Sequence, residues 1–196
     1  AVKLRELMLL GQVFESHILS LAMLSLPDLL FPDGKPAECN IVGMYNLDKE
    51  TVGKALALRA VGTDICRVVG RRFGHPISAR IGGMVQPLSE EERKGLLEKL
   101  NAAEAHVVWF SQLLRSLVEK NAQAIESLGD IRTAYLGLAQ NDTLAFYAGE
   151  IKVIKEDASP LKRFNPNQYF DHVEEKVENW SYMKFPVLKS GERFRV

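Results

Sequence analysis

The sequence has little cysteine and no net charge, and both facts narrow the chemistry it can perform. Cys39 and Cys66 are its two cysteines among 196 residues, and no CxxC pair is present. A zinc site or a disulfide framework needs more sulfur at closer spacing, so we predict that both are ordinary thiols. Lys plus Arg and Asp plus Glu number 25 each, so the chain as a whole has no electrostatic reason to bind nucleic acid.

Several catalytic motifs are also missing. Neither the GxxxxGK[ST] loop nor the GxGxxG loop occurs, and there is no GxSxG elbow. No glutamate precedes a histidine by three residues, as the ligands of a di-iron helix bundle would. The pairs Glu15 with His17 and Glu104 with His106 are two residues apart, which places them on different faces of a helix. We therefore expect no catalytic residue in this chain.

Long hydrophobic runs are absent as well. The apolar run 18–26 is shorter than the roughly 20 residues that span a bilayer, and Arg5, Glu6 and Glu15 interrupt its approach. No signal peptide pattern is visible, so we predict no membrane span and a cytoplasmic location. The chain begins within an apolar helical pattern and ends at ERFRV without a cap, which suggests an internal fragment of a longer protein.

Helical spacing of apolar residues dominates the first 129 residues. The segment 4–26 is apolar on nearly all faces and stops at Pro27, which predicts a central, largely buried helix. A second helix is expected from Asp48 to Gly70. Ser89 and Glu92 form an S-x-x-E capping box before a helix of about ten turns.

The apolar pattern changes to that of strands after Gly129. Strands are expected at 131–138, 143–147 and 151–154, and a helix start at Asn165 precedes DHVEEKVE. We predict three parts: a helical bundle core at 1–129, a small antiparallel β insertion at 130–160, and a short helix with an extended aromatic tail at 161–196. The predicted fold class is mainly α, a long-helix bundle with that insertion.

The glycine-rich segment 70–84, GRRFGHPISARIGGM, stands apart from the helices around it. It contains His75 before a proline and no acidic residue. Glycines there permit the close approach of another chain or a cofactor, and the basic residues add local positive charge. The alternative is a plain connection whose arginines pair with acids elsewhere. Its candidate functional residues are Arg71, Arg72, His75, Gly82 and Gly83.

The other histidines favour structural roles. His17 lies on the most apolar helix and is predicted to be a hydrogen-bonded core residue. His106 and His172 lie in charged helical surroundings, which predicts surface positions.

Four stretches resemble one known family. They are RELMLLGQVFESHILSLAMLSLPDLL, ALRAVGTDICRVVGRRFGHPISARIGGM, IRTAYLGLAQNDTLAFYAGEIKVI and WSYMKFPVLKSGERFRV. In order and spacing they resemble the large subunit of nickel-iron hydrogenases, and the wording is most similar to the soluble cytoplasmic group. The GRR-x-x-HP-x(5)-GG and WSYMKFPVLK segments together make the match specific.

The resemblance implies both a parent activity and what this chain lacks. The parent enzyme would interconvert hydrogen with protons and electrons at a Ni-Fe centre held by two CxxC pairs. Neither pair is present, and Cys39 and Cys66 match neither motif. We therefore expect this chain to be an inactive scaffold that binds no cofactor. Expected partners are the iron-sulfur small subunit, which the segment 70–84 would face, and further electron-transfer subunits.

Two alternatives stay open at this point. One is a fragment of the related quinone-reducing subunit of respiratory complex I, which resembles the same fold without the nickel cysteines. The other is a non-catalytic helical interaction protein. For a fragment without its flanks, exposed apolar faces would also favour self-association.

Overall fold

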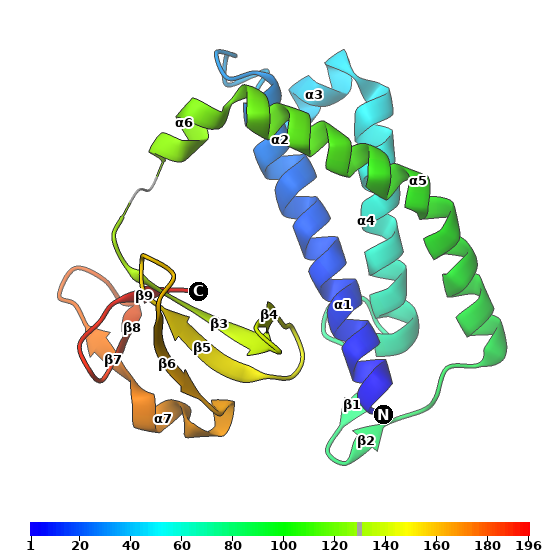
Figure 1. Ribbon diagram of the computed structural model, residues 1–196. Coiled ribbons are helices and arrows are strands. Elements are labelled where there is room, and N and C mark those ends of the chain that lie inside the picture. Colours follow the sequence, from blue (N-terminus) through cyan, green and yellow to red (C-terminus); the bar gives the residue numbers. More distant parts are fainter. Residues whose placement is uncertain (129–130) are drawn as a thin grey trace. The chain divides into compact units, whose positions relative to one another are not determined.

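The chain folds into two compact units. A computed structural model describes residues 1–128 and 131–196, so the predicted boundary at 129 and 130 lies outside the described residues. The units are Ala1–Leu128 and Gly129–Val196. Figure 1 shows helices in the first unit and mainly strands in the second.

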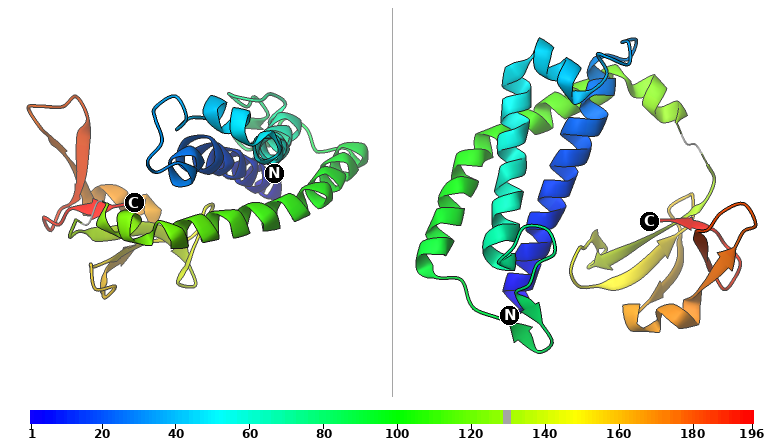
Figure 2. Two further views of the ribbon diagram at one scale, coloured as in Figure 1. Left: turned by 90° about the horizontal axis from the view of Figure 1, so that it is seen from above. Right: turned by 180° about the vertical axis from the view of Figure 1, so that it is seen from behind.

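Three long helices make up most of the first unit. Figure 2 shows from two further directions that α1 and α4 run side by side, and α5 packs on α4. The elements of this unit are α1 (Val2–Ile18), the π-helix η1 (Leu19–Ser25), α2 (Leu26–Leu30), α3 (Ile41–Leu47), α4 (Lys49–Gly70), strands β1 (Ala79–Arg80) and β2 (Gly83–Met84), α5 (Glu90–Lys120) and α6 (Ala122–Ser127).

The first helix continues past the proline that was expected to end it. Between α1 and α2 the π-helix η1 pairs the backbone N–H of Leu26 with the carbonyl of Leu21, five residues back. This wider register lets Pro27 enter the first turn of α2, where a missing N–H costs little. The helix therefore ends at Leu30 rather than before Pro27.

Glycines set the contact between α1 and α4. A Cβ on Gly62 would lie 2.7 Å from the backbone nitrogen of Glu15, and a Cβ on Gly11 would lie 2.6 Å from Cγ2 of Ile65. The backbones therefore approach more closely than larger residues allow. Around this contact Ala55, Leu58 and other apolar side chains form the core of the unit.

The prediction that α1 is largely buried is wrong. Its buried residues are Gly11, Glu15 and Ile18, all on the side that packs against α4. Leu10 keeps 46% of its surface exposed. The helix is apolar on two faces, and within the described residues α4 covers one of them.

Helix α5 makes contact through a narrow stripe. The predicted capping box is present: the Ser89 hydroxyl accepts from the N–H of Glu92, whose carboxylate accepts from the N–H of Ser89. Asn121 at its other end donates through Nδ2 to the carbonyl of Leu29 in α2 at 3.2 Å. The buried residues recur every seven positions, at Leu96, Ala103, Phe110 and Leu117.

The continuous helix Val2–Leu30 is long and apolar enough to cross a membrane by length and composition. Its mean hydropathy is 1.5, and 22% of its most apolar window is buried. The sequence argument for no membrane span counted only the run 18–26. Helices of soluble proteins also meet this criterion, so the finding by itself is weak evidence for a membrane span.

The second unit is built around a five-stranded sheet. Its order is β4-β3-β5-β6, and β9 pairs parallel to β3; β7 and β8 form a separate antiparallel pair. The elements are β3 (Ala134–Gln140), β4 (Thr143–Leu144), β5 (Glu150–Ile154), β6 (Pro160–Phe164), the 3-10 helix η2 (Pro166–Gln168), α7 (Tyr169–His172), β7 (Val173–Val177), β8 (Lys184–Leu188) and β9 (Phe194–Arg195).

The predicted fold class, a mainly α long-helix bundle with a small antiparallel β insertion, is wrong. The strands are not an insertion, because they extend almost to the end of the chain within a unit of their own. They form several sheets and include the parallel pair β3 and β9. The segment DHVEEKVE, expected to be helical, becomes β7 after one helical turn, because Val173 is buried and pairs with Leu188.

The glycine contact predicts opposite effects for two substitutions in α4. Gly62→Ala should lower the free energy of unfolding by about 1–3 kcal/mol, because the new methyl group would force α1 and α4 apart. Gly53→Ala is the matched control: nothing lies within 4 Å of its Cβ, so it should stabilise α4 by up to about 1 kcal/mol. Urea unfolding followed by circular dichroism measures both. Equal effects would contradict the close contact.

Candidate functional site

The segment between α4 and α5 leaves the helical layer as a loop and a short hairpin. Arg71 ends α4 in the left-handed region at φ 61°, and the hairpin pairs Ala79 with Met84 and Arg80 with Gly83. Gly82 occupies the turn at φ 84°, a conformation that L side chains rarely adopt. Glycine at this position is therefore explained by the turn itself.

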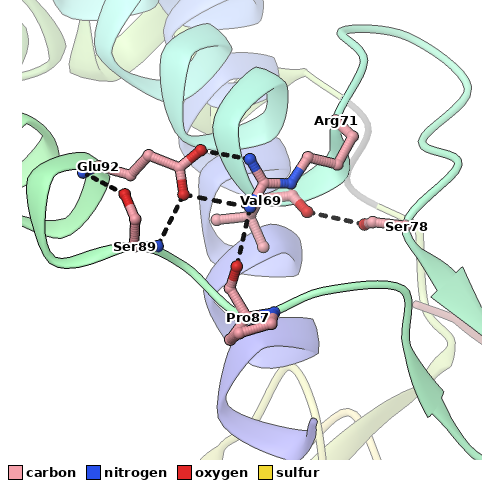
Figure 3. Close-up of polar contacts among 6 residues, drawn as sticks. All are labelled: Val69, Arg71, Ser78, Pro87, Ser89 and Glu92. Atoms are coloured by element: carbon pink, nitrogen blue, oxygen red, sulfur yellow. Dashed lines mark hydrogen bonds and ion pairs between the residues drawn. The ribbon is translucent and has the colours of Figure 1, made fainter.

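Hydrogen bonds from three residues tie this segment to the helices. The buried hydroxyl of Ser78 donates to the carbonyl of Val69 at 2.7 Å (Figure 3). The backbone N–H of Ile77 donates to the carbonyl of Gly70 at 3.0 Å. Arg5 of α1 donates through one guanidinium nitrogen to the carbonyls of both Gly83 and Arg80. The hairpin is thus held at both of its strands.

Arg71 is engaged within the chain. Its guanidinium makes a two-pronged ion pair with Glu92 and donates to the carbonyl of Pro87 at 2.9 Å (Figure 3). Hydrogen bonds from Arg71 and from the backbone of Ser89 lower the pKa of Glu92 from 4.5 to about 2. The side chain of Arg71 is only 20% exposed. Its contacts join the end of α4 to the start of α5.

The other basic residues point to solvent. Arg72, His75 and Arg80 are exposed, and no acidic residue occurs between Asp64 and Glu90. Apolar side chains are exposed beside them, and Ile81 is fully exposed at the hairpin turn. We call this set the 72–85 surface: Arg72, Phe73, His75, Ile77, Arg80, Ile81, Gly82, Gly83 and Val85. A positive and apolar surface of this kind suits an acidic protein partner.

His75 and the two glycines lie openly on this surface. His75 adopts φ 53°, an uncommon conformation for a residue with a side chain. Cβ atoms added at Gly82 or Gly83 would meet nothing within 4 Å. Contacts inside the described chain therefore do not explain why position 83 is glycine.

The two cysteines do not form a joint site. Cys39 donates to the carbonyl of Phe31, whereas Cys66 is buried in α4 and contacts the carbonyl of Met8 at 3.8 Å. Burial, and to a lesser extent the charge of Glu15, raises the pKa of the Cys66 thiol, so it stays protonated. Among residues 1–128 and 131–196, no group of three or more His, Cys, Asp or Glu side chains could hold a metal ion. The donors described here do not fit a Ni-Fe centre or an iron-sulfur cluster.

The histidines are placed differently from one another. His17 is exposed beside an apolar groove, so its prediction as a core residue is wrong. His172 is half-buried, with its ring centroid 4.3 Å from that of Phe164. His106 is half-buried on α5. The structure does not bring any of these three to His75.

Sequence reasoning missed two structural cations. Arg59 of α4 binds the buried carboxylate of Glu15 in α1, with Nε 2.8 Å from Oε1. Arg5 holds the hairpin, as described above. One signal was available, because Glu15 is an isolated charge within an apolar helical run and a buried carboxylate needs a partner.

Comparison with known proteins gives one consistent likeness. The chain is 37% identical over 190 residues to a vhu subunit of the F420-non-reducing hydrogenase of Methanococcus voltae, covering 96% of this chain and 45% of that protein. It is 30% identical over 197 residues to the NAD-reducing hydrogenase HoxS subunit beta of Cupriavidus necator, covering 96% and 40%. No protein-family profile matches the chain.

A solved structure shares the fold. The crystal structure of an NAD+-reducing [NiFe]-hydrogenase in the H2-reduced state matches with a TM-score of 0.90 and 30% identity, over 96% of this chain and 42% of that chain. The chain thus spans less than half the length of the relatives it matches.

These comparisons correct the assignment made from the sequence. The matched proteins are named as hydrogenase subunits, one from vhu and the other the beta subunit of HoxS, and they do not support the narrower assignment to a large subunit. The statement that stands is the broader one: the chain is similar to subunits of hydrogenases, which are oxidoreductases.

The Arg71–Glu92 pair predicts an acid-sensitive connection between α4 and α5. The pKa of Glu92 is about 2 in the folded chain and 4.5 in the reference state, so the pair stabilises fully above pH 4.5 and is lost as pH falls toward 2. Glu92→Gln should reduce stability at pH 7 and flatten its fall between pH 4.5 and 2. Thermal unfolding across this range measures both effects.

The adjacent exposed carboxylate provides the control for that experiment. Glu91→Gln removes the same charge from the first turn of α5 without touching Arg71. It should leave most of the acid dependence in place. Identical profiles for the two variants would show that the ion pair contributes nothing.

Proposed function

We propose that this chain is a scaffold portion of a hydrogenase subunit, and that the complete enzyme interconverts H2 with protons and electrons. The observation that carries the proposal is the match of 96% of the chain, at a TM-score of 0.90, to part of an NAD+-reducing [NiFe]-hydrogenase. The chemistry itself belongs to residues outside this chain, because the described residues contain no set of metal ligands. The 196 residues alone would be inactive, and their site would be the cytoplasm.

The 72–85 surface is where we propose that a second subunit binds. An iron-sulfur cluster held by thiolates is negatively charged, and histidine or arginine donors near its sulfur atoms stabilise the reduced form. Arg72 and His75 are exposed and available for this role, while Gly82 and Gly83 leave room for a partner backbone. Arg71 supports the surface from within, through Glu92 and Pro87.

The fold of the segment supports this reading over a plain connection. A connection between α4 and α5 needs neither a hairpin nor a set of exposed Phe73, Ile77 and Ile81. Exposed apolar side chains surrounded by charge are typical of protein interfaces. The absence of acidic residues along the segment leaves its positive charge uncompensated locally.

The proposal predicts a specific loss in the complete, purified hydrogenase complex. His75→Ala and Arg72→Ala should weaken by about tenfold the binding of the iron-sulfur subunit, or slow H2-dependent reduction of the electron acceptor, since each removes a donor from the interface. Arg115→Ala, an equally exposed arginine on α5, is the control and should change neither. The affinity between the subunits is measured together with acceptor reduction.

The two parts of the proposal fail in different ways. A complete complex that neither consumes nor evolves H2 would contradict the hydrogenase assignment. A complex that is active and unaffected by both variants would instead contradict the role of the 72–85 surface.

A further inference from the structure

An apolar groove lies in the helical unit, away from the 72–85 surface. It has a volume of about 420 Å³, and its lining includes Leu7, Leu10, Phe14, His17, Ile65 and Leu100. A smaller recess of about 150 Å³ shares Leu7, Ile65 and Leu100 with it. The two therefore form one continuous feature, which we call the α1–α5 groove.

The groove exists because α1 is apolar on two faces. One face carries the Gly11 contact with α4 and is covered, while Leu10 and Leu100 remain 46% and 41% exposed. Exposed apolar surface of this size costs free energy in water unless something covers it. Among the described residues that line the groove, His17 has the one polar side chain, so the groove lacks the convergent polar groups that orient a small ligand.

The spacing of the lining residues suits a helix. Leu7, Leu10, Phe14 and His17 follow each other at steps of three, four and three, which makes a ridge along one side of α1. Leu100 of α5 faces this ridge across Ile65 of α4. A helix that places apolar residues at i, i+3 or i+4, and i+7 fills such a groove.

The length of the relatives indicates where that helix comes from. The matched region is 45% of the Methanococcus voltae protein and 42% of the solved hydrogenase chain, so more than half of each lies outside it. We propose that the α1–α5 groove binds an apolar helix contributed by the part of the same hydrogenase subunit that lies outside these 196 residues. This inference rests on the proposed function.

A lipid bilayer fits the groove less well, although Val2–Leu30 is apolar enough to span one. Crossing a bilayer would require α1 to leave α4, which would separate the buried carboxylate of Glu15 from Arg59. An unpaired charge is costly in hydrocarbon. The groove is also a recess between two helices, which matches another helix better than a lipid surface.

The test uses peptides of about 20 residues, long enough to form helices, that tile the flanking sequence encoded by the same gene. Each dye-labelled peptide is titrated into the 196-residue chain and followed by fluorescence anisotropy. At least one peptide should bind and become helical. Leu10→Gln and Leu100→Gln should each weaken its binding at least tenfold. Both positions are partly exposed, so the variants should fold, which circular dichroism checks.

The matched control is Leu56→Gln on α4, which is 49% exposed and does not line the groove. It should leave peptide binding unchanged. Hydrogen exchange should also slow at residues 7–18 when the peptide is bound.

Four outcomes would overturn the inference. They are a gene that encodes nothing beyond these residues, no binding by any peptide, equal binding to all variants, and loss of dimers or of phosphatidylcholine vesicle binding in the groove variants. The last pair would assign the groove to a second copy of the chain or to a membrane. None of these results bears on whether the complete complex oxidises H2, so failure here is distinguishable from failure of the proposed function.

Discussion

The close contact of α1 with α4 is the constraint on which the helical unit depends. Gly11 and Gly62 let two backbones meet where a single methyl group would collide with main-chain atoms. That proximity also brings Glu15 within reach of Arg59, and a buried carboxylate needs such a partner to remain charged. Because α1 uses one face for this contact, its second apolar face remains beside α5. The core and the groove therefore have the same origin.

Local signals were sufficient to predict the helices, and non-local pairing explains the failures. The caps at Asp48 and Ser89 act within one turn, so the starts of α4 and α5 follow from the sequence. The parallel pairing of β3 with β9 joins residues about 60 positions apart, which no short pattern encodes. The same holds for β7, where pairing of Val173 with Leu188 overrides a helix-like run of charges.

The candidate site was predictable in place but not in detail. Glycines, a proline and the missing acids single out the segment 70–84 from composition alone. Which arginine would turn inward depended on Glu92, which lies 21 positions further along and whose capping role was the only one evident from the sequence. The position of Arg5 against the hairpin carbonyls was likewise invisible, because it depends on where α1 packs.

The ties on the segment between α4 and α5 have a thermodynamic consequence for binding. Arg71 with Glu92, Ser78 with Val69, and Arg5 with the hairpin fix its backbone before any partner arrives. A free loop loses conformational entropy when it binds, about 0.5–1.5 kcal/mol for each immobilised side chain, in addition to the ordering of its backbone. The backbone part of that loss is already incurred when this chain folds. A partner that meets the hairpin thus gains a larger share of the interaction energy as affinity.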